Sequence, residues 1–170
     1  MLAIYTSHGH YIRSKAWNMM NWGPEARNPS NNIGISAHYF SAVAKGNDVH
    51  LTFLSTDILL YTKYSYSSNS WGVETKIQPQ PVTTTSAPFL SIDSAGDLHL
   101  FWAGSPKANH IYYKRMSGGA WEPSLVDWIN ESAEGLTGND SLTTFYEATP
   151  SPGLVYLTRP ARPYNVKFAD

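Results

Sequence analysis

The sequence of 170 residues contains no cysteine, and only 15% of its residues are charged. Without cysteine, the chain can form no disulfide, no thiolate nucleophile and no zinc site with sulfur ligands. No apolar run reaches the ~20 residues that a membrane-spanning helix needs. The opening stretch MLAIYTSHGHYIRSK is too polar for a signal peptide. We therefore expect no membrane partner, and the sequence leaves both a cytosolic and a secreted location open.

The net charge of −1 provides no basic surface for DNA or RNA, so we expect no nucleic-acid partner. Hydrophobic residues make up 42% of the chain, which is enough for a buried core. Aromatic residues reach 14%, a content typical of β-proteins and of surfaces that stack on sugars. We expect residues 1–170 to form a single domain, or part of a larger one, without a cofactor.

A repeat of about fifty residues runs through the chain. The stretch SAVAKGNDVHLTFLS, which contains His50, recurs as LSIDSAGDLHLFWAG around His99. A tryptophan recurs with nearly the same spacing at Trp22, Trp71 and Trp121. A residue that is repeated once in every unit usually has a structural role. We therefore interpret His50 and His99 as residues that pack or that hydrogen bond between neighbouring repeats, rather than as catalytic residues.

Each repeat contains four short runs rich in β-branched and aromatic residues, separated by turns. In one repeat the runs cover 37–43, 49–54, 59–66 and 71–77. The second run is apolar on both faces, which predicts a strand that is covered on both sides. The fourth run alternates, with Trp71, Val73, Thr75 and Ile77 on one face, which predicts a half-exposed strand.

Four such strands per repeat predict an all-β fold, a β-propeller built of four-stranded antiparallel blades. The blades are expected at about 1–28, 35–78, 86–129 and 141–170, the first lacking its first strand and the last its fourth. A closed propeller usually has ~4–8 complete blades, and this chain supplies about three and a half. Either a second copy completes the ring as a homo-oligomer, such as a dimer, or a portion is missing, or the chain closes as an imperfect four-bladed ring.

The stretches YTKYSYSSNSWG and YYKRMSGGAW resemble the Asp-box turn of sialidase-like propellers, Ser-x-Asp-x-Gly-x-x-Trp, without its aspartate. The resemblance implies a propeller and, for sialidases, three carboxylate-binding arginines, a tyrosine nucleophile with a glutamate, and an acid/base aspartate. Arg13 and Arg115 lie in matching third strands and look like repeat residues, and only Arg159 and Arg162 lie in an unrepeated loop. A complete sialidase site within this chain is therefore not expected.

The unrepeated loops are expected at one end of the propeller, where ligands bind in many repeat proteins. They contain the candidate ligand-binding residues His8, His10, Asp57, Lys107, Glu131, Glu134, Arg159 and Arg162. Local roles compete with function at each of them. His8 and His10 have no third ligand at a fixed spacing, so no metal site is predicted. An aspartate in a turn commonly bonds nearby backbone amides, and arginines in loops are commonly solvated.

The repeated Trp22, Trp71 and Trp121 are interpreted first as packing residues, although some propeller lectins stack sugars on such aromatics. The sequence favours a non-catalytic module that recognises a glycan or a protein at the loop end or in grooves between blades. One alternative is a sialidase-type glycoside hydrolase whose site is completed by another chain or a missing segment. Another is a structural or assembly domain.

Overall fold

A computed structural model describes residues 1–7, 11–27, 39–55, 58–77, 87–104, 106–136, 142–146, 152–158 and 165–169. This part of the chain consists of strands and turns, with 16 strands in four antiparallel sheets and no helix. It accordingly contains no helix that is long and apolar enough to cross a membrane. The expected all-β class is confirmed.

Each sheet is formed by strands that are consecutive in the sequence. The first sheet contains β1 (Leu2–Ser7), β2 (Tyr11–Ala16) and β3 (Ala26–Arg27). The second contains β4 (Phe40–Lys45), β5 (Asp48–Ser55), β6 (Ile58–Ser65), β7 (Ser70–Trp71) and β8 (Thr75–Lys76). The third contains β9 (Phe89–Ile92), β10 (Leu98–Ala103), β11 (His110–Ser117), β12 (Ala120–Trp121) and β13 (Val126–Asn130). The fourth contains β14 (Leu142–Tyr146), β15 (Pro152–Thr158) and β16 (Asn165–Ala169).

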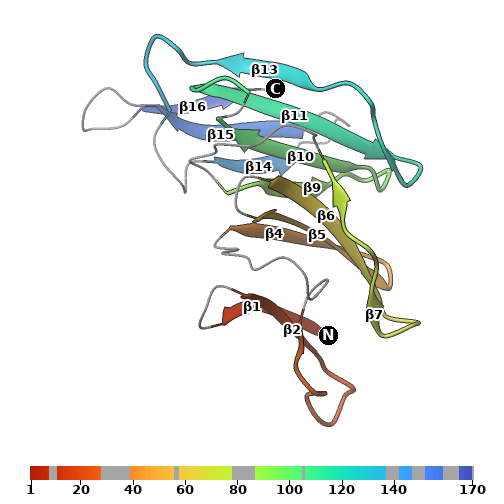
Figure 1. Cartoon of the computed structure of the whole chain (residues 1–170). Helices are drawn as coiled ribbons and strands as arrows, with labels where there is room; N and C mark the ends of the chain where they lie inside the picture. The colour runs from red at the N-terminus through yellow and green to blue at the C-terminus, as the bar shows by residue number, and fades with distance from the viewer. Residues whose placement is uncertain are drawn as a thin grey trace.

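The four sheets pack on one another in chain order, with the first and fourth at opposite ends of the series (Figure 1). Ile12 of the first sheet packs with Leu51 and Phe53 of the second. The other two boundaries are filled in the same way. The second boundary includes Leu54, Leu59, Leu90, Leu100, Trp102 and Tyr112, and the third includes Phe101, Ala103, Ile111, Leu154 and Tyr156. The core is therefore divided into layers between neighbouring sheets.

The central strands β5 and β10 are covered on both faces, as their sequences predict. From His50 to Ser55 every residue of β5 is buried, and every residue of β10 is buried. Burial on both sides is expected for a strand that lies inside a sheet whose two faces each meet a neighbour. The prediction from the sequence is confirmed for both repeats.

The outer strand of the second sheet differs from the prediction. It is split into β7 and β8, and Val73 between them is 89% exposed rather than sharing a face with buried Ile77. Trp71 pairs with Tyr64 and Thr75 pairs with Tyr61, so three residues on the outer strand oppose two on β6. The extra residue is a bulge, and it breaks the alternation on which the prediction depended. The third sheet is split in the same manner into β12 and β13.

The repeated histidines have a structural role, as expected, but they form hydrogen bonds within one sheet where bonds between neighbouring repeats were predicted. The Nδ1 atom of His50 is hydrogen bonded to the hydroxyl of Tyr61 at 2.7 Å, and His99 is bonded to Tyr113 at 2.8 Å. Each histidine ring also stacks on its tyrosine. Both bonds join neighbouring strands of the same sheet rather than two sheets. They fix the diagonal packing of the second and third strands in each unit.

We expect His50 to make the fold sensitive to acid. Burial lowers the pKa of His50 from 6.5 to about 4, helped by the charge of Lys63. Between pH 6.5 and about pH 4, the His50 imidazole is protonated in the unfolded chain but neutral in the folded chain. Protonation therefore favours the unfolded chain, and the free energy of unfolding decreases as the pH falls through this range. Since one pKa unit corresponds to about 1.4 kcal/mol, urea unfolding across the window should show a loss of about 3 kcal/mol from this residue.

The matched variant is His50→Gln, which cannot titrate. It should remove part of the acid-dependent loss while it also lowers stability at neutral pH, because Tyr61 loses its partner. An unchanged pH dependence in His50→Gln would assign the acid sensitivity to other groups.

Candidate binding cleft between the first two sheets

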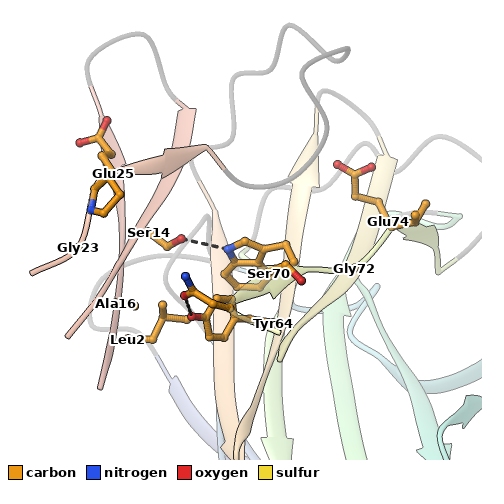
Figure 2. A pocket seen from close by; sticks show the side chains of 13 residues that line it. Leu2, Ser14, Ala16, Gly23, Glu25, Tyr64, Ser70, Gly72 and Glu74 are labelled. Atoms are coloured by element: carbon orange, nitrogen blue, oxygen red, sulfur yellow. Dashed lines mark hydrogen bonds between the residues drawn. The ribbon is translucent and has the colours of Figure 1, made fainter. Parts of the chain in front are cut away.

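A cleft of about 530 Å³ opens between the outer strands of the first and second sheets (Figure 2). Its lining combines apolar surface with hydroxyl, amide and carboxylate groups. The lining residues are Leu2, Ser14, Ala16, Gly23, Pro24, Glu25, Tyr64, Asn69, Ser70, Trp71, Gly72, Val73 and Glu74. This volume and this mixture are typical of sites that bind small molecules.

Trp71 is held in a fixed orientation in this cleft. Its indole Nε1 donates a hydrogen bond to the Ser14 hydroxyl across the sheet boundary at 3.0 Å, drawn as a dashed line in Figure 2. The indole ring also lies 5.3 Å from the ring of Tyr64. The Tyr64 hydroxyl in turn donates to Oδ1 of Asn69 at 2.6 Å. A half-buried indole that is already ordered loses little entropy when a ligand packs on it.

The same location at the next sheet boundary is filled by an aromatic ring. Trp17, Tyr64 and Met116 each pair with the repeated tryptophan of their unit. Three residues before these positions lie Ser14 in the first sheet and Tyr61 in the second.

Tyr61 packs edge-on against Trp121, with ring centroids 5.4 Å apart. The indole Nε1 of Trp121 is buried and lacks a hydrogen-bond partner among the described residues. The small side chain of Ser14 therefore both opens the first boundary and satisfies the indole of Trp71, whereas Tyr61 takes up the space at the second.

Glu25 and Glu74 border the cleft from the first and second sheets (Figure 2). The Glu25 carboxylate accepts hydrogen bonds from the Tyr5 hydroxyl and from Nη1 of Arg13, both at 2.5 Å. The hydrogen bond from Tyr5, followed by the charge of Arg13, lowers the pKa of Glu25. Tyr5 and Arg13 alternate with Ile4 and with the buried Ile12, so this carboxylate engages the face of the first sheet that is turned away from the second.

The structure places six of the eleven predicted site residues, and one of them, Glu131, is buried. Trp71 lies in the cleft, and Trp121 lies at the next boundary. Trp22 is 46% exposed and packs on Trp17 outside the cleft, with ring centroids 5.3 Å apart. Lys107 and Glu134 are engaged in local contacts instead. His8, His10, Asp57, Arg159 and Arg162 lie outside the described residues.

Lys107 follows β10 of the third sheet, whereas Glu134 lies at the boundary between the third and fourth sheets, where it contacts β15 and β16. Lys107 pairs with Asp127 at 3.2 Å. Glu134 accepts a hydrogen bond from Thr158 at 2.7 Å and pairs with Lys167 at 3.0 Å. Their charges are thus partly compensated within the fold. The described part of the chain contains no group of three histidine, aspartate or glutamate residues that could hold a metal ion.

A tyrosine–glutamate pair of the type that sialidases use occurs at this third boundary. The Tyr156 hydroxyl donates to Glu131 at 2.6 Å. Both residues are buried, and burial raises the pKa of Tyr156 to about 12. Because both side chains are covered by protein, the pair has the properties of a structural contact between the third and fourth sheets. Neither residue lies in the cleft beside Trp71.

The sequence identified Trp71 but missed Ser14 and Asn69, which orient its surroundings. The available signal was a departure from the repeat, because Ser14 stands where later units carry Tyr61 and Tyr113. This equivalence becomes visible only when the strand register is known, since the loop lengths differ between units.

The chain is similar in structure to AofleA from Arthrobotrys oligospora. A crystal structure of an AofleA variant with three arginines replaced by alanine matches 99% of this chain with a TM-score of 0.68 and 15% identity. A second AofleA crystal structure matches 76% of this chain with a TM-score of 0.52 and 11% identity. In the first comparison this chain spans 49% of the AofleA chain, or about half its length. No protein-family model and no curated protein matches the chain. At this level of identity the likeness concerns the fold.

Proposed function

We propose that this protein is a non-catalytic carbohydrate-binding module and that a sugar ring packs on Trp71 in the cleft between the first two sheets. The observation that carries the proposal is the open, ordered indole beside Ser14. An aromatic ring offers a flat apolar surface to the C–H face of a sugar. The hydroxyl of Ser70, the amide of Asn69 and the carboxylate of Glu74 border the same cleft and can hydrogen bond to sugar hydroxyls.

We also propose that the four sheets are consecutive blades of a β-propeller related to the sialidase-like group. The serial packing of antiparallel meanders and the covered central strands support this arrangement. The repeated tryptophan after the third strand supports the relation to the Asp-box turn. A fold of this kind carries many unrelated activities, so the function depends on the cleft and not on the fold.

Binding should be measured by screening the folded protein on a glycan array and by titrating the best hit in a calorimeter. Trp71→Ala should weaken the hit at least tenfold, which corresponds to about 1.4 kcal/mol. Ser14→Tyr should weaken it similarly, because the phenol then fills the space that Tyr61 takes up at the next boundary. The matched control is Trp22→Ala, which removes an exposed indole outside the cleft.

The two variants and the control separate the outcomes. Loss of binding with Trp71→Ala and Ser14→Tyr but not with Trp22→Ala supports the cleft. If Trp22→Ala weakens glycan binding as much as Trp71→Ala does, the binding site does not lie in the cleft. A folded protein that binds nothing on the array overturns carbohydrate recognition and leaves protein recognition or assembly as its role.

A further inference from the structure

The fourth sheet presents an apolar face at the end of the series. Leu154 and Tyr156 of β15 pack on the third sheet, so the alternating Val155 and Leu157 face the opposite way. Their partners on β16 are Phe168 and Val166, which share that face. These two side chains are 70% and 56% exposed. Phe168 and Val166 thus lie within a sheet face of the kind that is buried between neighbouring sheets elsewhere in the molecule, and not at the tip of a loop.

The first sheet presents the opposite kind of face at the other end. Tyr5 is half-exposed and pairs with Arg13, which lies four residues before Trp17, the partner of the repeated Trp22. In the second and third sheets the equivalent positions are Phe53 and Trp102, which are 2% and 0% exposed because each packs against the sheet that precedes it. Within the described residues, no sheet precedes the first one. The face around Tyr5 therefore corresponds to faces that are buried in the second and third sheets, but no preceding sheet among the described residues covers it.

We propose that the end face formed by Val155, Leu157, Val166 and Phe168 packs on the Tyr5 face of a second copy of this chain, head to tail. The contact continues the packing that already joins the sheets within one copy. A chain of the same fold, AofleA, is about twice as long as this one, so the fold has room for a second set of sheets, and a second copy supplies such a set. The inference rests on the proposed serial arrangement of the sheets and is independent of carbohydrate binding.

A head-to-tail contact uses two different surfaces, so each copy offers one of each. Two contacts close a ring of two copies if the rotation per copy is a half turn, and otherwise the contact propagates into larger assemblies. Because the first and fourth sheets lie at opposite ends (Figure 1), both surfaces of one copy are available at the same time.

The test is the solution mass by light scattering, where one copy has 18.9 kDa. The wild type should have at least twice this mass. Tyr11 lies two residues before Arg13 on β2 and therefore shares the Tyr5 face. Phe168→Glu and Tyr11→Glu place a charge on the two proposed end faces, at side chains that are 70% and 36% exposed, so both variants should fold. Each should weaken self-association at least tenfold. Met20→Glu, at an 81% exposed turn residue outside both faces, is the control and should leave the mass unchanged.

Mixing the two defective variants distinguishes the geometry. In a head-to-tail contact, the intact fourth-sheet face of Tyr11→Glu meets the intact first-sheet face of Phe168→Glu, so the mixture should associate although each variant alone does not. A monomeric wild type at high concentration overturns the inference. A contact between two identical faces also overturns the inference, and in that case only one of the two variants shows reduced self-association. The Trp71 cleft lies within one copy, so glycan binding by a monomeric protein would leave the proposed function intact.

Discussion

Replacing Trp102 by alanine should lower the free energy of unfolding by about 3–5 kcal/mol, the range expected when a large aromatic side chain is removed from a core. Trp102 is fully buried on β10, where it packs among the apolar side chains that join the second and third sheets, and its ring stacks on Tyr112 at 5.8 Å. The residues that line the cavity left by the indole lose their van der Waals contacts with it, and no other group replaces these contacts. Such a loss is comparable with the whole stability of many domains.

The measurement is urea unfolding followed by circular dichroism, which does not depend on the removed fluorophore. Trp102→Phe should cost less, since a ring still fills part of the space. Trp22→Ala is the matched control, because the same side chain is removed from a site that is 46% exposed. If the midpoints of Trp102→Ala and Trp22→Ala coincide, the boundary between the sheets contributes less than the layered core requires.

The order and spacing of the strands could be predicted from the sequence because each unit repeats one pattern. Apolar residues on both faces of 49–54 predict a covered strand, and β5 is covered. The outer strand could not be predicted in the same way. Trp71, Val73 and Ile77 follow strict alternation in the sequence, but the unpaired residue between β7 and β8 turns Val73 outward. A bulge depends on pairing with another strand, which alternation alone does not encode.

The site was predicted in part. Repetition pointed to Trp71, but it gave equal weight to Trp22 and Trp121, whose surroundings differ. The difference arises at Ser14 and Tyr61, which lie in the preceding unit and contact the tryptophan across a sheet boundary. Contacts between units depend on register and loop length, and a sequence pattern within one unit does not contain them. The partners of the charged loop residues could not be predicted either, because they are distant in the sequence, as Lys107 and Asp127 show.

Glu131→Ala should also destabilise the fold strongly, by about 3 kcal/mol, because it leaves the buried Tyr156 hydroxyl without its acceptor and removes one of the two carboxylates that Lys167 contacts. Glu131 is 7% exposed and follows β13 at the end of the third sheet. Its carboxylate accepts hydrogen bonds from the Tyr156 hydroxyl at 2.6 Å and from Nζ of Lys167 at 3.0 Å, both in the fourth sheet. The residue therefore ties the last two sheets together through charged and neutral donors.

A double-mutant cycle resolves this network into its parts. Lys167→Met should cost less than Glu131→Ala, because the Lys167 side chain is 32% exposed and water can replace part of its interaction. In the double variant the costs should not add, since the two residues share one contact. Glu122→Ala is the control, because its carboxylate is 42% exposed and lies 4.0 Å from Arg115, so its loss should cost less than about 0.5 kcal/mol. Equal effects of Glu131→Ala and Glu122→Ala in urea unfolding would mean that the buried carboxylate does not join the sheets.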